Sequence, residues 1–310
     1  MGGDNMTWVS EFILLGLSTD QQTQVGLFVV FGATYLMTLL GNGLIILLIW
    51  LDARLHSPMY FFLCNLSVVD ICYTTSGVPQ MLAHFLMEKK TISYTRCATQ
   101  LFFSLALGGI EFLLLAAMAY DRYVAVCDPL QYVMVMRRGM YVGLAIVSWL
   151  IGLVNSAVET AVTMRLPTCG QNVLNHVVCE TVAIVRLACV DITFNQIIIL
   201  ISSIIVLLMP CCLVSLSYVY IVTAILRIRS TQGRRKAFGT CTSHLTVVSM
   251  SYGIALFTYM QPHGSVSAEQ DKIVGLFYAV VTPMLNPLIY SLRNKDMKAA
   301  LKKVIRKSSA

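Results

Sequence analysis

The amino-acid sequence predicts an all-α membrane protein, a bundle of seven transmembrane helices. Two observations lead to this fold class. The 310 residues are 57% hydrophobic and only 12% charged, about half the charge of a typical soluble domain. The apolar residues gather in seven stretches, each of about 20 residues or more, the length that crosses a bilayer as a helix. We therefore expect one membrane domain, without a soluble domain, an internal repeat or a long linker.

The seven predicted spans follow from these apolar lengths. They cover residues 25–50, 58–82, 98–126, 140–162, 196–228, 237–260 and 273–292. The chain then divides into an extracellular N-terminal tail 1–24, a seven-transmembrane domain 25–292 and a cytoplasmic tail 293–310. Residues 1–20 are acidic and lack a basic leader segment. We predict no cleavable signal peptide, so the first span would serve as an uncleaved anchor.

The basic residues predict the orientation. With the N-terminus outside, the inner segments hold Arg54, Arg137, Arg138 and the basic residues of 227–236 and 293–307. The outer segments hold only Lys89, Lys90, Arg96, Arg165, Arg186 and Lys272. The positive-inside rule therefore favours an outer N-terminus and an inner C-terminus. The net charge of +7 is expected to lie against anionic membrane lipid rather than nucleic acid. Asn5, in Asn-Met-Thr, is an outer glycosylation acceptor.

Four of the ten cysteines lie in predicted outer segments, where disulfides persist. They allow three pairings. Cys169 and Cys189 flank Cys179 at equal spacing, so a Cys169–Cys189 bridge would close the long loop on itself. Cys97, at the top of the third span, would then hold that loop through Cys179. The alternative is four free thiols, which the oxidising compartment disfavours.

The third span ends in Met-Ala-Tyr-Asp-Arg-Tyr, residues 118–123. An acid and a base at the edge of the hydrocarbon cost several kcal/mol, on the order of the insertion scales. Arg122 could anchor the helix at the interface. It could instead act as a switch that pairs with Asp121 in one state and with a partner protein in another. Alone, the motif is too short to decide.

Four polar residues lie inside predicted spans: Asn42, Asp70, Glu111 and Asn286. Such residues face the interior of a helix bundle. Glu111 and Arg122 lie on one face of the third span, because they belong to a series of residues spaced three and four apart: Ser104, Gly108, Glu111, Leu115, Met118 and Arg122. One interpretation is hydrogen bonding between helices. The other is a Na⁺ or proton site at Asp70 and Glu111, because two close carboxylates cannot both stay ionised without a counter-ion.

Several segments together resemble the vertebrate olfactory receptors, a branch of the rhodopsin-like G-protein-coupled receptors. They are Gly41-Asn42, the PMYFFL run 58–63, MAYDRYVAVC 118–127, the segment KAFGTCTSH 236–244 and the segment PMLNPLIYSLRN 283–294. The pattern resembles the terrestrial-type class, class II. The resemblance implies a short amphipathic helix in the tail, a plasma-membrane location in olfactory cilia and no enzyme activity. It implies no cofactor, although Na⁺ remains a candidate at Asp70 and Glu111. The chain departs from the family at Ser251, where an aromatic residue is common.

The resemblance also implies residue roles at the inner face. The coupling and switch residues are Asp121, Arg122, Tyr123, Tyr218, His244, Asn286, Pro287 and Tyr290. Tyr218 and Tyr290 would rotate inward on activation and free Arg122. Arg234 and Arg235 stand where many related receptors have an acid, so no lock from Arg122 to that helix is expected. His244 is the candidate substitute partner of Arg122; its alternative role is a packing histidine.

Matched positions imply a ligand pocket in the outer third of the bundle. Its predicted lining is Ser104, Leu105, Gly108, Gly109, Ser202, Ser203, Val206, Tyr252, Ala255, Tyr259 and Ala279. This lining is apolar with a few hydroxyls, which suits a small, weakly polar volatile. The implied function is an odorant receptor that activates a stimulatory olfactory-type G protein and raises cAMP. Three alternatives remain: a receptor for a non-volatile ligand outside the nose, a transporter or channel, and an intramembrane enzyme. The sequence shows no half-repeats, which a transporter or channel would usually have. It also shows no nucleophile–base pair within the spans, which an intramembrane enzyme would need.

Overall fold

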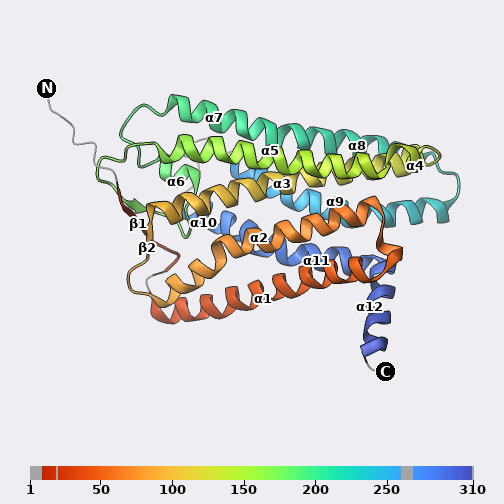
Figure 1. Ribbon diagram of the computed structural model, residues 1–310, viewed down its shortest axis with the longest axis horizontal. Coiled ribbons are helices and arrows are strands. Elements are labelled where there is room, and N and C mark those ends of the chain that lie inside the picture. Colours follow the sequence, from red (N-terminus) through yellow and green to blue (C-terminus); the bar gives the residue numbers. More distant parts are fainter. Residues whose placement is uncertain (1–8, 19, 260–267, 309–310) are drawn as a thin grey trace.

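The computed structural model is a bundle of long helices, and it describes residues 9–18, 20–259 and 268–308. Six helical segments of the described residues are long and apolar enough to cross a membrane, and a shorter apolar helix, Cys241–Phe257, completes the set. All seven predicted spans are therefore present, and the predicted fold class is confirmed. The two ends of the bundle differ (Figure 1): strands β1 and β2 lie at one, the sheet end, and α12 lies at the other, the tail end.

The spans are longer than their apolar cores because the helices continue beyond the hydrocarbon. The first four are α1 Gln21–Leu51, α2 Pro58–Leu86, α3 Tyr94–Cys127 and α5 Arg138–Met164. Polar caps define some of their starts. Asp20 accepts a hydrogen bond from the N–H of Thr23 at the start of α1, and Pro58 occupies the first turn of α2, where its missing N–H costs nothing.

The fifth and seventh spans each contain a π-helical turn. The fifth consists of α7 Thr193–Ser203, η2 Ile204–Leu208 and α8 Met209–Leu226. The sixth is α9 Thr231–Tyr259. The seventh consists of α10 Ala268–Leu276, η3 Phe277–Val281 and α11 Thr282–Arg293. Both π turns are followed by a proline at the first turn of the next helix. Such single π turns are frequent at functional sites.

Helix α3 is the centre of the bundle. It packs against α2, α5, α8 and α9, and almost every residue from Leu107 to Ala119 is buried. Its approach to α5 is close because α5 presents small residues there. A Cβ atom on Gly152 would lie 2.4 Å from Cγ1 of Ile110 and 3.0 Å from the carbonyl oxygen of Ala106. Small residues permit such close helix packing in membranes.

A second close approach explains the Gly-Asn pair of α1. A Cβ atom on Gly41 would lie 3.0 Å from Cγ of Pro287 in α11. The next side chain, Asn42, is buried and donates to the carbonyl oxygens of Thr38 and Pro283, each at 3.1 Å. The pair therefore joins the first and seventh spans by contact and by a hydrogen bond.

A three-stranded sheet at the sheet end was not predicted from the sequence. Its order is β2-β1-β3, with β1 Glu11–Leu14, β2 Thr91–Ser93 and β3 Val173–Leu174. Strand β1 pairs antiparallel with β2 and parallel with β3. Alternate residues of β1, Phe12 and Leu14, are buried against the two disulfide-bonded residues Cys97 and Cys179. Part of the predicted N-terminal tail is thus packed structure.

Three short helices connect the longer elements. They are η1 Ala53–Leu55, α4 Tyr132–Val135 and α6 Thr181–Val185. After the seventh span, α12 Lys295–Ser308 turns away from the bundle axis. Met297 and Ala300 bury one face of α12 against the core, whereas Lys298 and Lys302 are exposed on the other. Helix α12 is therefore the short amphipathic C-terminal helix expected from the resemblance.

Candidate functional site

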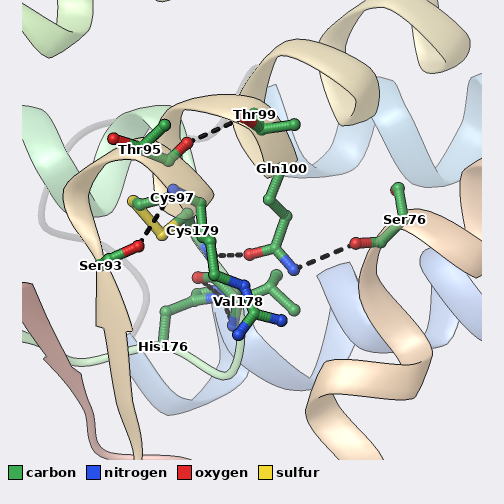
Figure 2. The surroundings of a disulfide bond; sticks show 10 residues. Ser76, Ser93, Thr95, Cys97, Thr99, Gln100, His176, Val178 and Cys179 are labelled. Carbon is green, nitrogen blue, oxygen red and sulfur yellow. Dashed lines mark hydrogen bonds between the residues drawn. A yellow bond between two sulfur atoms is a disulfide. The ribbon is translucent and has the colours of Figure 1, made fainter.

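The sheet end is held together by two disulfides. Cys97 of α3 is joined to Cys179, with Cα atoms 5.5 Å apart, and Cys169 is joined to Cys189, with Cα atoms 6.0 Å apart. The structure thus contains the pairing preferred from the cysteine spacing. Figure 2 shows a second tie beside the first disulfide: Gln100 accepts from the N–H of Cys179 at 2.8 Å and donates to the carbonyl oxygen of Ser76 at 3.4 Å. Gln100 was missed from the sequence, although it lies one helical turn after Cys97.

The predicted ligand-lining residues of α3 and η2 lie below this disulfide. Ser104, Leu105 and Gly108 are partly buried on α3. Gly109 is buried against the fifth span, since a Cβ atom there would lie 3.3 Å from Val206. Gly109 and Val206 therefore form a helix contact, and the accessible predicted lining of α3 is Ser104, Leu105 and Gly108.

Two predicted lining hydroxyls are engaged by the protein itself. The hydroxyl of Tyr252 donates to the carbonyl oxygen of Phe112 at 2.7 Å. The hydroxyl of Ser202 donates to Glu159 of α5 and accepts from Asn155 at 2.7 Å. Ser203 and Ala279 are partly buried and Ala255 is buried. The side chain of Tyr259 and the whole of Asn5 lie outside the residues that the structure describes.

One groove lies elsewhere on the bundle. It has a volume of about 480 Å³ and is lined by Gly253, Ile254, Phe257, Ile273, Val274 and Phe277. These residues belong to α9, α10 and the start of η3. None of them is in the predicted lining, although three are sequence neighbours of Tyr252, Ala255 and Tyr278. The groove therefore lies on another face of the same helices.

The two acids inside the bundle are both buried, with Asp70 1% and Glu111 3% exposed. Asn286 donates to Asp70 at 3.0 Å. Tyr278 donates to Glu111 at 2.8 Å and Ser251 donates to its other oxygen at 3.2 Å. Each carboxylate thus has its own donors. Ser251, the departure from the family pattern, supplies one of them.

Aromatic rings surround Glu111. The ring of Tyr278 is stacked on Phe112 with centroids 6.2 Å apart, and Tyr252 packs on the same ring at 4.9 Å. Tyr73 contacts Tyr278 edge to face at 6.2 Å. Tyr278 was not predicted as a site residue. Tyr278 could not be recognised from the sequence as the partner of Glu111, because that requires the register between α3 and η3.

At the tail end, Asp121 does not bind the neighbouring arginine. Its carboxylate accepts from the hydroxyl of Tyr132 in α4 at 2.8 Å. Nε of Arg122 is buried and has no hydrogen-bond partner among the described residues. The ring of Tyr123 is tilted against those of Tyr120 and Tyr220, with centroids 6.3 and 5.8 Å away. Arg122 and Asp121 therefore form no ion pair or hydrogen bond in the structure, and Tyr132 is the hydrogen-bond partner of the acid.

His244 forms a bridge between three spans. Its Nε2 lies 3.1 Å from the carbonyl oxygen of Leu115 in α3, and its Nδ1 lies 2.6 Å from the hydroxyl of Tyr218 in α8. A carbonyl only accepts, so Nε2 carries the proton and Nδ1 of the neutral ring accepts from Tyr218. Tyr218, rather than Arg122, is the partner of His244 in this structure. Tyr290 is buried, and its hydroxyl has no partner in the described part of the chain.

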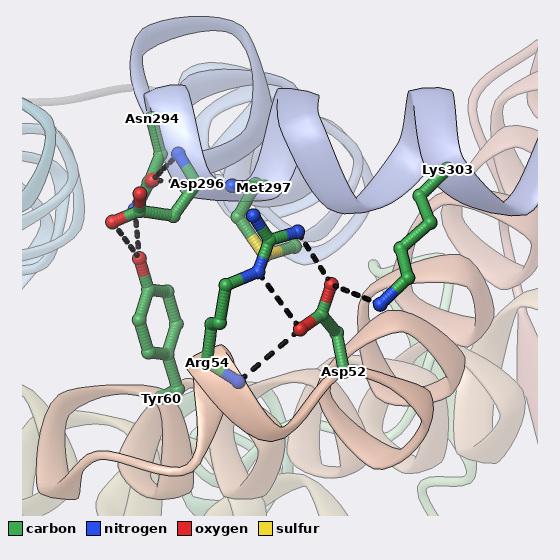
Figure 3. A network of polar contacts seen from close by, with 7 residues as sticks. All are labelled: Asp52, Arg54, Tyr60, Asn294, Asp296, Met297 and Lys303. Atoms are coloured by element: carbon green, nitrogen blue, oxygen red, sulfur yellow. Dashed lines mark hydrogen bonds and ion pairs between the residues drawn. The ribbon is translucent and has the colours of Figure 1, made fainter.

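A polar cluster ties α12 to the loop between α1 and α2 (Figure 3). Arg54 binds Asp52 through two hydrogen bonds, at 3.0 and 2.7 Å, and Lys303 lies 3.8 Å from the same carboxylate. The Arg54 side chain holds the pKa of Asp52 well below its usual range. Asn294 donates to Tyr60 at 2.8 Å and caps α12 by accepting from the N–H of Asp296 at 2.9 Å. This cluster assigns contacts to the tyrosine of PMYFFL and the asparagine of SLRN.

No metal centre is visible in the side chains: among the described residues, no group of three or more His, Cys, Asp or Glu could hold a metal ion. Asn286, which donates to Asp70 through Nδ2, has a buried Oδ1 without a hydrogen-bond partner in those residues, and Oδ1 of Asn42 in α1 is in the same state. Oxygen atoms are the ligands that hard cations prefer.

The arrangement of spans defines the class of protein. Squid rhodopsin has the same fold, with a TM-score of 0.71 over 94% of this chain and 87% of that one at 17% identity. The chain is therefore a seven-helix membrane protein with the rhodopsin-like fold.

The family model "Olfactory receptor" matches residues 31–308. Human olfactory receptor 2F1 is 60% identical over 309 residues, covering 100% of this chain and 98% of its own length. Dog olfactory receptor-like protein OLF3 is 59% identical, covering 98% and 96%. The chain belongs to the olfactory receptor family, a receptor family and not an enzyme family.

Proposed function

We propose that this chain is an odorant-activated receptor of the plasma membrane that couples to a stimulatory olfactory-type G protein and raises cAMP. The observation that carries the proposal is the full-length similarity to named olfactory receptors. The basic residues of the tail end favour a cytoplasmic tail end and an extracellular N-terminus. In this orientation Asn5 is a glycosylation acceptor. The proposed location is the cilia of olfactory neurons.

The proposed mechanism uses both ends of the bundle. A small, weakly polar volatile binds between α3, the fifth span, α9 and the seventh span, near Ser104 and Ser203. The tail end then opens to the G protein. The residues proposed to change position on activation are Tyr218, His244, Asn286, Pro287 and Tyr290. The residues proposed to contact the G protein are Asp121, Arg122 and Tyr123. The bridge from His244 to Tyr218 and Leu115 supports this role, because it ties three spans at the point that must separate.

The function is tested by expressing the receptor with an olfactory-type stimulatory G protein and screening volatile alcohols, ketones, aldehydes and esters for cAMP. We expect a dose-dependent response to a subset of them, absent from cells without the receptor. If the receptor reached the cell surface and responded only to water-soluble, non-volatile compounds, that result would contradict the odorant assignment. A ligand response without a cAMP rise would contradict the G-protein assignment.

We further propose that Asp70 and Glu111 act as one coupled cation or proton site. Asp70→Asn and Glu111→Gln keep the shape of each side chain. Each is expected to change the dependence of agonist potency on Na⁺ or pH, and the double variant is expected to add little, since coupled groups are non-additive. Potency is measured in sodium-containing and sodium-free buffer over a pH series. Glu88→Gln, at an exposed acid, is the control. Additive, independent effects would favour separate hydrogen-bonding roles.

The free hydroxyls of the proposed pocket are expected to set selectivity. Ser104→Ala and Ser203→Ala should change the potency order among alcohols, ketones, aldehydes and esters of similar size. A methylene discriminates by only about 1–3 kcal/mol, whereas a placed hydroxyl discriminates more sharply. Tyr259→Phe tests a further predicted lining hydroxyl, and Tyr252→Phe tests one that is bound to the carbonyl oxygen of Phe112. Concentration–response curves across the panel measure the order, with Ser249→Ala, on an exposed position of α9, as control. An equal loss for every ligand would remove these residues as selectors.

A further inference from the structure

A third buried carboxylate lies in the bundle, and the proposed function does not use it. Glu159 of α5 is 5% exposed. Its Oε2 accepts from the hydroxyl of Ser202 in α7, and its Oε1 accepts from the hydroxyl of Thr181 in α6 at 3.3 Å. Nδ2 of Asn155, one turn earlier in α5, donates to Ser202 at 2.7 Å. Two of these hydrogen bonds end on the carboxylate, and the third ends on the serine hydroxyl that donates to it.

Thr181 belongs to a segment that is also fixed from the other side. Cys179, two residues earlier, is joined to Cys97 of α3, and its N–H donates to Gln100 of α3 at 2.8 Å (Figure 2). Residues 179–181 are therefore held by α3 at one end and by Glu159 of α5 at the other. This segment lies at the sheet end, one to two helical turns beyond Ser104 of α3.

Ser202 gives the carboxylate a second attachment, to the fifth span. Asn195, two turns earlier in α7, donates to the carbonyl oxygen of Val162 in α5 at 3.1 Å. These two hydrogen bonds fix the rotation of α7 against α5. Ser203 follows Ser202 and lies about 100° around the helix from it. Ser203 is partly buried, and the hydrogen bond of Ser202 to Glu159 therefore decides where the hydroxyl of Ser203 is presented.

A carboxylate suits this geometry, because both of its oxygens accept a hydrogen bond. An acid within a span is costly, and the ion pairs of the described residues do not include Glu159. A glutamine of the same shape has one acceptor oxygen and an NH₂ group that cannot accept. Its oxygen can accept from one of the two hydroxyls, and towards the other it presents an NH₂ group, which only donates, so the hydrogen bond observed there is lost or reversed. Two hydroxyl donors from two different elements thus account for the acid at this position.

We propose that Glu159 is a positioning residue that anchors the segment Cys179–Thr181 and, through Ser202, helix α7 over the ligand site, and so sets the upper size limit of the ligand. This inference rests on the proposed function for its effect on ligands. The anchor itself is independent of any ligand, because all of its contacts are within the chain.

The anchor is tested on the purified full-length receptor by hydrogen–deuterium exchange of residues 179–185. Thr181→Val keeps the shape of threonine and removes the hydroxyl, whereas Thr181→Ser keeps the hydroxyl. We expect exchange about threefold to tenfold faster in Thr181→Val and Glu159→Gln, the range expected for loss of one hydrogen bond, and wild-type exchange in Thr181→Ser. Thr99→Val, which removes an exposed hydroxyl bound within its own helix, is the matched control. Equal exchange in the valine and serine variants would overturn the anchor, and the Thr181 pair decides even if Glu159→Gln fails to fold.

The effect on ligands is tested with a homologous series of straight-chain odorants that contains an active member. Thr181→Val and Ser202→Ala are expected to shift the longest active chain length, and Thr181→Ser and Thr99→Val are expected to leave it unchanged. An equal loss of potency at all chain lengths would overturn the positioning role. Faster exchange in Thr181→Val, combined with a wild-type receptor that no odorant activates, would refute the proposed function and leave the anchor in place.

Discussion

Replacing Gly152 by leucine is expected to abolish the folded receptor. The first atom of any side chain would lie 2.4 Å from Ile110 and 3.0 Å from the backbone oxygen of Ala106. The backbone cannot yield without separating α5 from α3, the helix at the centre of the bundle. Overpacking in a well-packed core costs about 1–3 kcal/mol or more, and leucine adds three carbons beyond the clashing one. Size-exclusion chromatography of detergent-extracted, fluorescently tagged protein measures the monodisperse fraction.

The same helix supplies the control for this experiment. A Cβ atom on Gly143 meets no atom within 4 Å, so Gly143→Leu is expected to extract and elute like the wild type. Ile110→Ala should partly restore Gly152→Ala, because the nearest clash is with the Ile110 side chain. Similar yields for the two leucine variants would show that the close approach of α3 and α5 is not needed for folding.

Arg122→Ala is expected to abolish agonist-driven cAMP while surface expression stays largely intact. In the structure the guanidinium has no ion pair with Asp121, which binds Tyr132 instead. Removing Arg122 therefore breaks no ion pair with Asp121, and we expect the substitution to impair the step that engages the G protein. Surface staining and cAMP measured in the same cells separate the two effects.

Arg137→Ala removes the same charge from an exposed position near the same end of the bundle and is expected to signal. Comparing it with Arg122→Ala separates a specific role from the general basicity of the tail end. Full signalling by Arg122→Ala would contradict the switch role and favour simple interface anchoring.

The apolar pattern was sufficient to predict the seven spans, because the bilayer sets helix length by hydrophobicity alone. The same local logic applies to the cysteines, where the outer compartment and the equal spacing around Cys179 favoured the pairing that the structure contains. The amphipathic helix α12 followed from the family resemblance. The spans, the disulfides and α12 depend on short stretches of sequence or on the surrounding solvent. Predicting them therefore does not require knowing which helices are in contact.

The partners of polar side chains were decided only by the tertiary structure. Ser202 was predicted to face the ligand but binds Glu159, and His244 was considered as the partner of Arg122 but binds Tyr218. The strand β1 was not predicted, because its four residues become a strand only between β2, about 80 positions further along the chain, and β3, 160 positions further along. The physical reason is common to all three cases. Burial in a membrane follows from the side chain itself, whereas a hydrogen bond depends on the rotation and register of two helices, which the packing of the whole bundle sets.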